Sequence, residues 1–79
     1  MRRITAKQVR DEILIGGRPC VHCTHRDLST GLERKGKVYI GSYQSGFDGA
    51  LVFDSTEEGV YAHIRLRDEN DGETYELLI

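Results

Sequence analysis

The stretch that constrains the fold most strongly is VYAHIRLRDENDGETYELLI, residues 60–79. Apolar and polar residues alternate over 60–67, which is the period-two pattern of a half-buried strand. Asp71-Gly72 is typical of a two-residue hairpin turn, because both positions of that turn favour positive φ. The turn would bring three pairs opposite one another: Leu66 and Leu77, Ile64 and Ile79, and Arg67 and Glu76. The sequence therefore predicts a C-terminal hairpin.

Near the N-terminus, the pattern predicts a helix over residues 5–15. Thr5 and Gln8 have the spacing of a capping box, in which each side chain accepts a hydrogen bond from the other residue's backbone N–H. The glycine pair at 16–17 supplies a stop, because glycine adopts the positive φ that ends many helices. The alternative is that residues 13–15 open a strand.

Between the helix and the hairpin, strand-like runs alternate with turns. We expect a short strand within 18–24, a polar and basic loop over 25–36 with a turn at 29–31, strands over 37–43 and 50–54, and Gly-rich or acidic turns over 44–49 and 55–59. Residues 1–79 are thus predicted to form one α+β domain. In it, an N-terminal helix packs on an antiparallel β-meander of four to five strands.

The composition restricts the class of protein. With 38% hydrophobic and 30% charged residues, the chain has the profile of a soluble globular domain and not of a disordered or fibrous one. No apolar run approaches the roughly 18–20 residues that span a bilayer, and no leader pattern is present, so we expect no membrane contact. Two cysteines in such a chain point to reduced thiols and to the cytoplasm.

The charges are sorted along the chain. Residues 1–37 hold nine Lys or Arg against four Asp or Glu, a net charge of +5, whereas residues 38–79 hold two against nine, a net charge of −7. Such a separation gives a small domain two surfaces of opposite sign and steers its association with partners. It predicts a binding protein and says little about which partner is bound.

The acids gather at predicted turns, and they form the first candidate site. The expected partner-binding residues are Asp54, Glu57, Glu58, Asp68, Glu69, Asp71 and Glu73. Spaced carboxylates of this kind could face a basic, nucleic-acid-binding groove of another protein. The alternative is that they only keep the surface soluble and protect sheet edges from pairing.

A basic and aromatic stripe forms the second candidate site, for nucleic acid. Its residues are Tyr61, His63, Arg65 and Arg67, which share the polar face of the strand over 60–67, with Tyr39 and Tyr43 as extensions. Open sheets bind single-stranded nucleic acid through aromatic rings interleaved with arginines. Further cations come from the first half of the chain: Arg2, Arg3, Arg34, Lys35 and Lys37. The alternative is a merely solvated sheet face.

The segment CVHCTH, residues 20–25, is a third candidate, for zinc. Cys20 and Cys23 have the spacing of a zinc knuckle, with His22 and His25 at the same offset. A structural zinc normally takes two ligands from such a knuckle and two from a distant element, and the sequence offers only His63 there. Core cysteines beside surface histidines are the favoured interpretation, so no cofactor is expected. No phosphate-binding loop and no activated nucleophile is apparent, so no enzyme is predicted.

In size, single-domain character, acidic surface and lack of a catalytic motif, the chain resembles the small inhibitors encoded by phages and mobile elements, anti-CRISPR proteins among them. This resemblance covers the chain as a profile of size and composition. It implies a non-enzymatic inhibitor that blocks a nucleic-acid-binding surface of a host complex in the host cytoplasm, with carboxylates partly in place of phosphates. A small nucleic-acid-binding domain and a zinc-stabilised domain are the alternatives.

Overall fold

The computed structural model of the chain describes residues 2–42, 49–55, 63–67 and 72–79. Within them the elements are β1 (Arg3–Ile4), α1 (Ala6–Leu14), β2 (Val21–Asp27), β3 (Glu33–Ile40), β4 (Leu51–Ser55), β5 (His63–Leu66) and β6 (Tyr75–Leu78). The strands pair antiparallel in the order β1-β6-β2-β3-β4-β5. The predicted α+β class is confirmed, and the described sheet has six strands where four to five were expected.

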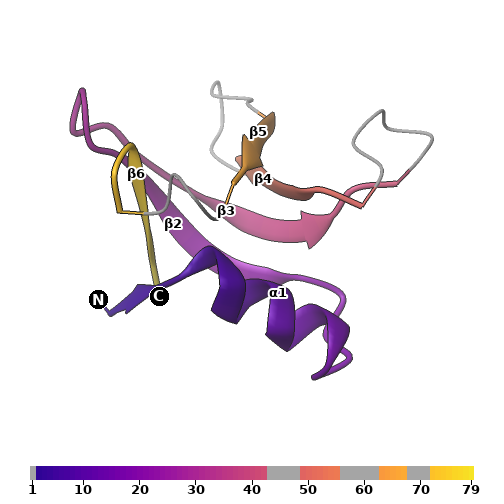
Figure 1. Ribbon diagram of the computed structural model, residues 1–79. Coiled ribbons are helices and arrows are strands. Elements are labelled where there is room, and N and C mark those ends of the chain that lie inside the picture. Colours follow the sequence, from indigo (N-terminus) through magenta and orange to yellow (C-terminus); the bar gives the residue numbers. More distant parts are fainter. Residues whose placement is uncertain (1, 43–48, 56–62, 68–71) are drawn as a thin grey trace.

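Helix α1 forms where the capping pattern placed it (Figure 1). The Thr5 hydroxyl accepts from the Gln8 backbone N–H at 3.1 Å, and the Thr5 N–H donates to Gln8 Oε1 at 2.9 Å. The helix ends at Leu14, followed by Gly17 with a φ of +71°, so the alternative of a strand over 13–15 is wrong. Among the described residues, no helix has the length and apolar character needed to cross a membrane.

The segment predicted as a basic loop over 25–36 is instead a long hairpin of β2 and β3. Its turn lies where it was expected, with Gly31 at a φ of +75°. Asp27 Oδ1 fixes that turn by accepting from the backbone N–H and the hydroxyl of Ser29, at 2.8 and 2.7 Å. The polar sequence did not indicate the strands because one face of this hairpin is solvated. On β3 this face carries Lys35 and Lys37, which alternate with the buried Gly36 and Val38.

The C-terminal strand pairs differently from the prediction. β6 lies between β1 and β2, and β5 pairs with β4, so the hairpin expected over 60–79 is wrong. Leu77 stands opposite His25 of β2, and Glu76 stands opposite Arg26. Glu76 therefore forms its ion pair with Arg26, at 3.1 Å, and not with Arg67. Proximity in the chain favoured β5 as the partner, but β2 and β1 together offer β6 a partner on each side.

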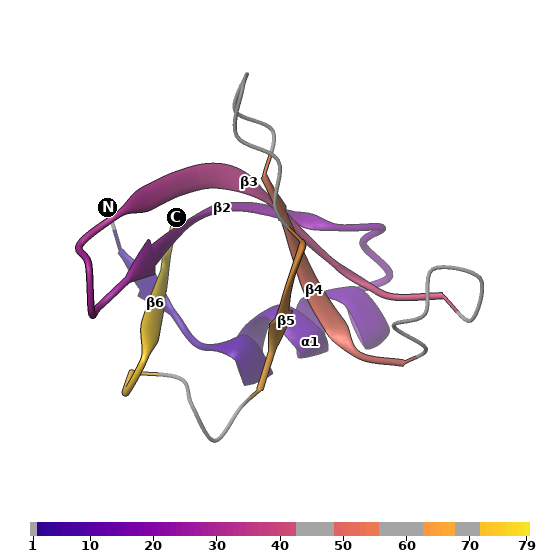
Figure 2. The ribbon, with the colours of Figure 1, turned by 90° about the horizontal axis from the view of Figure 1, so that it is seen from above.

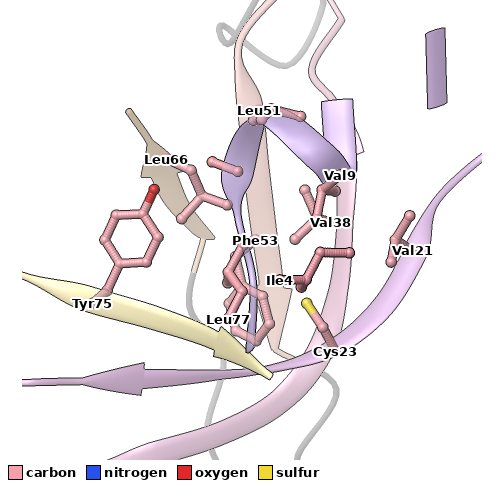
Figure 3. Close-up of a cluster of buried hydrophobic side chains, with 11 residues drawn as sticks. Ile4, Val9, Val21, Cys23, Val38, Leu51, Phe53, Leu66, Tyr75 and Leu77 are labelled. Atoms are coloured by element: carbon pink, nitrogen blue, oxygen red, sulfur yellow. The ribbon is translucent and has the colours of Figure 1, made fainter. Parts of the chain in front are cut away.

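The sheet is strongly curved, and β5 and β6 face each other across its interior (Figure 2). Side chains from all six strands fill this interior, and α1 covers one side of it through Ala6 and Val9 (Figure 3). The largest fully buried side chain is that of Phe53. The core comprises Ile4, Ala6, Val9, Val21, Cys23, Val38, Leu51, Phe53, Leu66, Tyr75 and Leu77. As predicted, Leu66 and Leu77 are both buried, although their strands are not paired.

Gly36 of β3 allows β4 to approach closely at the middle of the sheet. It is opposite Cys23 of β2 and Ser55 of β4. A Cβ at this position would overlap the backbone carbonyl oxygen of Asp54 and lie 2.8 Å from Cζ of Phe53. Because the backbone of β4 and the largest core ring both occupy that space, only glycine fits without a shift of the strand.

Gly36→Ala should therefore destabilise the fold. Overpacking at a site closed by backbone is expected to lower the free energy of unfolding by about 1–3 kcal/mol. Urea denaturation followed by circular dichroism measures the loss, with Lys35→Ala, an exposed neighbour on the same strand, as the control. Equal stability of the two variants would contradict this role of Gly36.

Candidate functional site

The outer face of β3, β4 and β5 brings an aromatic and an arginine into one row. Tyr39 is opposite Val52, and Val52 is opposite Arg65, so the three side chains point to the same side of the sheet. Tyr39 is half-buried and Arg65 is exposed. Since neighbouring strands lie about 4.8 Å apart, the Cα atoms of Tyr39 and Arg65 are about 10 Å from each other.

Lys37 and Asp54 form the adjacent row. They are opposite one another on β3 and β4, and both are half-buried. A hollow of about 430 Å³ opens beside them, and Tyr39 and Cys20 also line it. Lys35 continues the face toward the β2–β3 turn as an exposed cation. The depression is thus bordered by one aromatic ring, one cation and one carboxylate, and Lys35 and Arg65 lie elsewhere on the same outer face.

The alternation predicted for residues 60–67 is confirmed at 64–67, the part that the structure describes with side chains. Ile64 packs against the core and Leu66 is buried, while Arg65 and Arg67 are exposed. The backbone of His63 is opposite Asp54, and Tyr61 lies outside the described residues. The pairing with β4 is what brings Arg65 into line with Tyr39.

The predicted acidic surface is described at two of its seven positions. Asp54 is half-buried on the outer face opposite Lys37, so it belongs to the same surface as the cations and not to a separate acidic one. Glu73 is exposed just before β6. The other five residues, Glu57, Glu58, Asp68, Glu69 and Asp71, lie outside the described residues.

The zinc constellation is wrong as a four-ligand site. In the extended backbone from residue 20 onward, alternate side chains point to opposite faces of the sheet. Cys20 lies on the side of His22, with its Sγ 3.9 Å from the Nε2 of that histidine. Cys23 and His25 point the other way and are buried. The four side chains cannot surround one ion, and no group of three or more possible ligands occurs among the described residues.

Cys23 is part of the core. Burial raises the pKa of its thiol from 9.0 to about 11, because the thiolate would be charged in an apolar environment. The thiol is therefore protonated at neutral pH and is a poor nucleophile or metal ligand there.

His25 lies on the inner side of the sheet, although it was predicted to lie at the start of a polar loop. It is 4% exposed, its ring stacks on Tyr75 with centroids 5.3 Å apart, and Phe53 packs at 5.2 Å. Burial lowers the pKa of His25, Arg34 lowers it further, and Asp27 opposes the shift. Its Nδ1 is buried and has no hydrogen-bond partner in the described structure. The spacing of Val21, Cys23 and His25 is the signal that could have predicted this position, once the segment is taken as a strand.

Comparison with known proteins gives no relative: no family model, no curated protein and no solved structure matches the chain.

Acidification should weaken the fold through His25. Because the folded-state pKa of His25 lies below the ordinary 6.5, its contribution is complete above pH 6.5 and is lost as the pH falls below that value. Urea denaturation between about pH 7 and about pH 5 should show a falling free energy of unfolding in the native protein and a flatter profile in His25→Gln. The low pKa of Asp27, which the Ser29 hydrogen bonds stabilise, acts below pH 3.8 and so in a different range. Exposed His22→Gln is the control and should keep the native slope.

Proposed function

We propose that this protein is a non-enzymatic binding module that holds single-stranded nucleic acid along the outer face of β3, β4 and β5. The observation that supports it best is the row of Tyr39, Val52 and Arg65 beside Lys37. An aromatic ring at half-buried depth offers a face on which a base stacks, and the two cations lie on either side to neutralise phosphates.

Asp54 restricts the path that a bound nucleic-acid strand would take. Its carboxylate borders the same hollow as Tyr39 and Lys37 and repels phosphate. The sugar-phosphate backbone is therefore expected to pass over Lys37 and Arg65, with a base turned inward toward Tyr39. Such an arrangement binds bases mainly by stacking and has little intrinsic sequence preference along this face.

Fluorescence anisotropy with a labelled single-stranded oligonucleotide of mixed sequence tests the proposal across salt concentrations. Lys37→Gln and Arg65→Gln should each weaken binding about three- to tenfold and reduce the salt slope by about one unit. Tyr39→Leu should weaken binding with an unchanged salt slope, because it removes stacking and leaves the charges. Lys7→Gln on α1 removes the same charge from an exposed position and is the control. Absence of binding by the native protein at low salt would overturn the proposal.

The second candidate is the inhibitor of a host nucleic-acid-binding complex, of the phage or anti-CRISPR type, with carboxylates in place of phosphates. The excess of acids in the second half of the chain favours it, together with the exposed position of Glu73. Here the partner is a protein with a basic groove, and the acidic residues bind it.

Asp54→Asn separates the two candidates, because it removes one carboxylate without altering the shape of the side chain. Nucleic-acid binding predicts a tighter complex with the oligonucleotide, since a repulsive charge is lost. The inhibitor hypothesis predicts weaker capture of the protein partner from the native host. The paired reversals Glu57→Lys with Glu58→Lys, and Asp68→Lys with Glu69→Lys, should abolish that capture, and unchanged capture in both would contradict the inhibitor hypothesis.

A further inference from the structure

Cys20 and His22 form an accessible pair of metal-donor atoms at the start of β2. Sγ of Cys20 lies 3.9 Å from Nε2 of His22. The cysteine is half-buried and borders the open hollow of about 430 Å³, and the histidine is exposed. An ion in solvent can therefore reach both donor atoms.

The backbone holds this pair in place before any ion binds. His22 is opposite Lys37 of β3, so its backbone belongs to the sheet. Pro19 comes directly before Cys20 and borders the same hollow, and its ring fixes its own φ. Because the two donors are already in contact, binding an ion orders few further side-chain angles.

The number of donors and their separation select the kind of ion. A structural zinc takes four ligands, and no group of three or more possible ligands is present in the part of the chain that the structure describes. With bonds of about 2.3 Å to sulfur and about 2.0 Å to nitrogen, a separation of 3.9 Å gives an angle of about 130° at the ion, wider than the about 109° of a tetrahedral site. Two donors at a wide angle suit a soft ion that two ligands satisfy, and Cu(I) is such an ion.

The neighbouring charges favour a monovalent ion. Lys37 is opposite His22 and borders the same hollow as Cys20. One thiolate with Cu(I) gives a neutral complex, whereas one thiolate with a divalent ion leaves a positive charge beside the Lys37 ammonium. Asp54 also borders the hollow and offsets the charge of one cation, that of Lys37.

The second thiol of the chain does not compete for the ion. Cys23 is buried among the core residues, and burial raises the pKa of its thiol to about 11. The group stays protonated at neutral pH, and a thiolate is the form that binds metal. Since the chain has two cysteines, Cys20 is its single accessible thiol.

We propose that Cys20 and His22 bind one Cu(I) ion between Sγ and Nε2, in a two-coordinate site. The thiol releases its proton to solvent as the sulfur–copper bond forms, and the neutral imidazole donates the lone pair of Nε2. Copper enters and stays as Cu(I), so no electron is transferred. The site is independent of the proposed nucleic-acid binding, because neither ligand belongs to the row of Tyr39, Val52 and Arg65.

Competition for Cu(I) with the chromophoric chelator bicinchoninate, in the absence of oxygen, measures the affinity. The native protein should hold one Cu(I) per chain. Cys20→Ser and His22→Gln should each weaken binding by more than about a hundredfold, the upper end of what the loss of a supporting hydrogen bond alone costs a metal site. Cys23→Ala removes the other thiol and is the matched control, with the native affinity expected. Circular dichroism reports whether each variant is folded.

X-ray absorption of the copper-loaded protein identifies the donors. One sulfur and one nitrogen neighbour are expected, with the protein monomeric by size-exclusion chromatography. Two sulfur neighbours together with a doubled mass would mean that copper joins Cys20 of two copies, and this would overturn the site within one chain. Unchanged affinity in His22→Gln, or no retention of Cu(I) against bicinchoninate, would also overturn it. Binding of Zn²⁺ as tight as that of Cu(I) would overturn the choice of a monovalent ion.

Discussion

The pairing of β6 with β2 is the contact on which the rest of the molecule depends. It joins the end of the chain to its first long strand, and β1 then adds to the other side of β6. Two backbone hydrogen bonds between residues 2 and 79 extend the pairing of β1 with β6. In each, the N–H of one residue donates to the carbonyl oxygen of the other at 2.8 Å. Because β6 pairs with β2 and β1 at one end of the described sheet, β5 forms the other end. The sheet between them curves around a shared core.

Local interactions made part of this fold predictable. The capping box of Thr5 and Gln8 involves neighbours three residues apart, so the sequence specifies it without knowledge of the tertiary structure. The turn at 29–31 and the strand alternation through Ile64 and Leu66 are equally local. These features were predicted correctly, because each depends on a few adjacent residues and a fixed period.

The partner of β6 could not be predicted in this way. Leu66 and Leu77 point into the same interior, so their pattern fits a hairpin and a curved sheet equally well. The charge of Glu76 is likewise matched by either arginine, and the ion pair with Arg26 also includes Glu33 of β3, at 2.8 Å. A ladder of three charged residues across three strands satisfies Arg26 on both sides, whereas the predicted hairpin offered Glu76 a single partner.

The same pairing explains why the candidate site was predicted only in part. Sequence periodicity placed Arg65 on a polar face, but the row it forms with Tyr39 exists because β4 lies between β3 and β5. The buried stack of His25 on Tyr75 exists because β6 lies beside β2, where Tyr75 is opposite Asp27. Arg65 stands on β5, the last strand at that end of the described sheet. Gly36 leaves room for Phe53 and for the backbone of Asp54, so β4 lies close to β3 and the row of Tyr39, Val52 and Arg65 can form across the three strands.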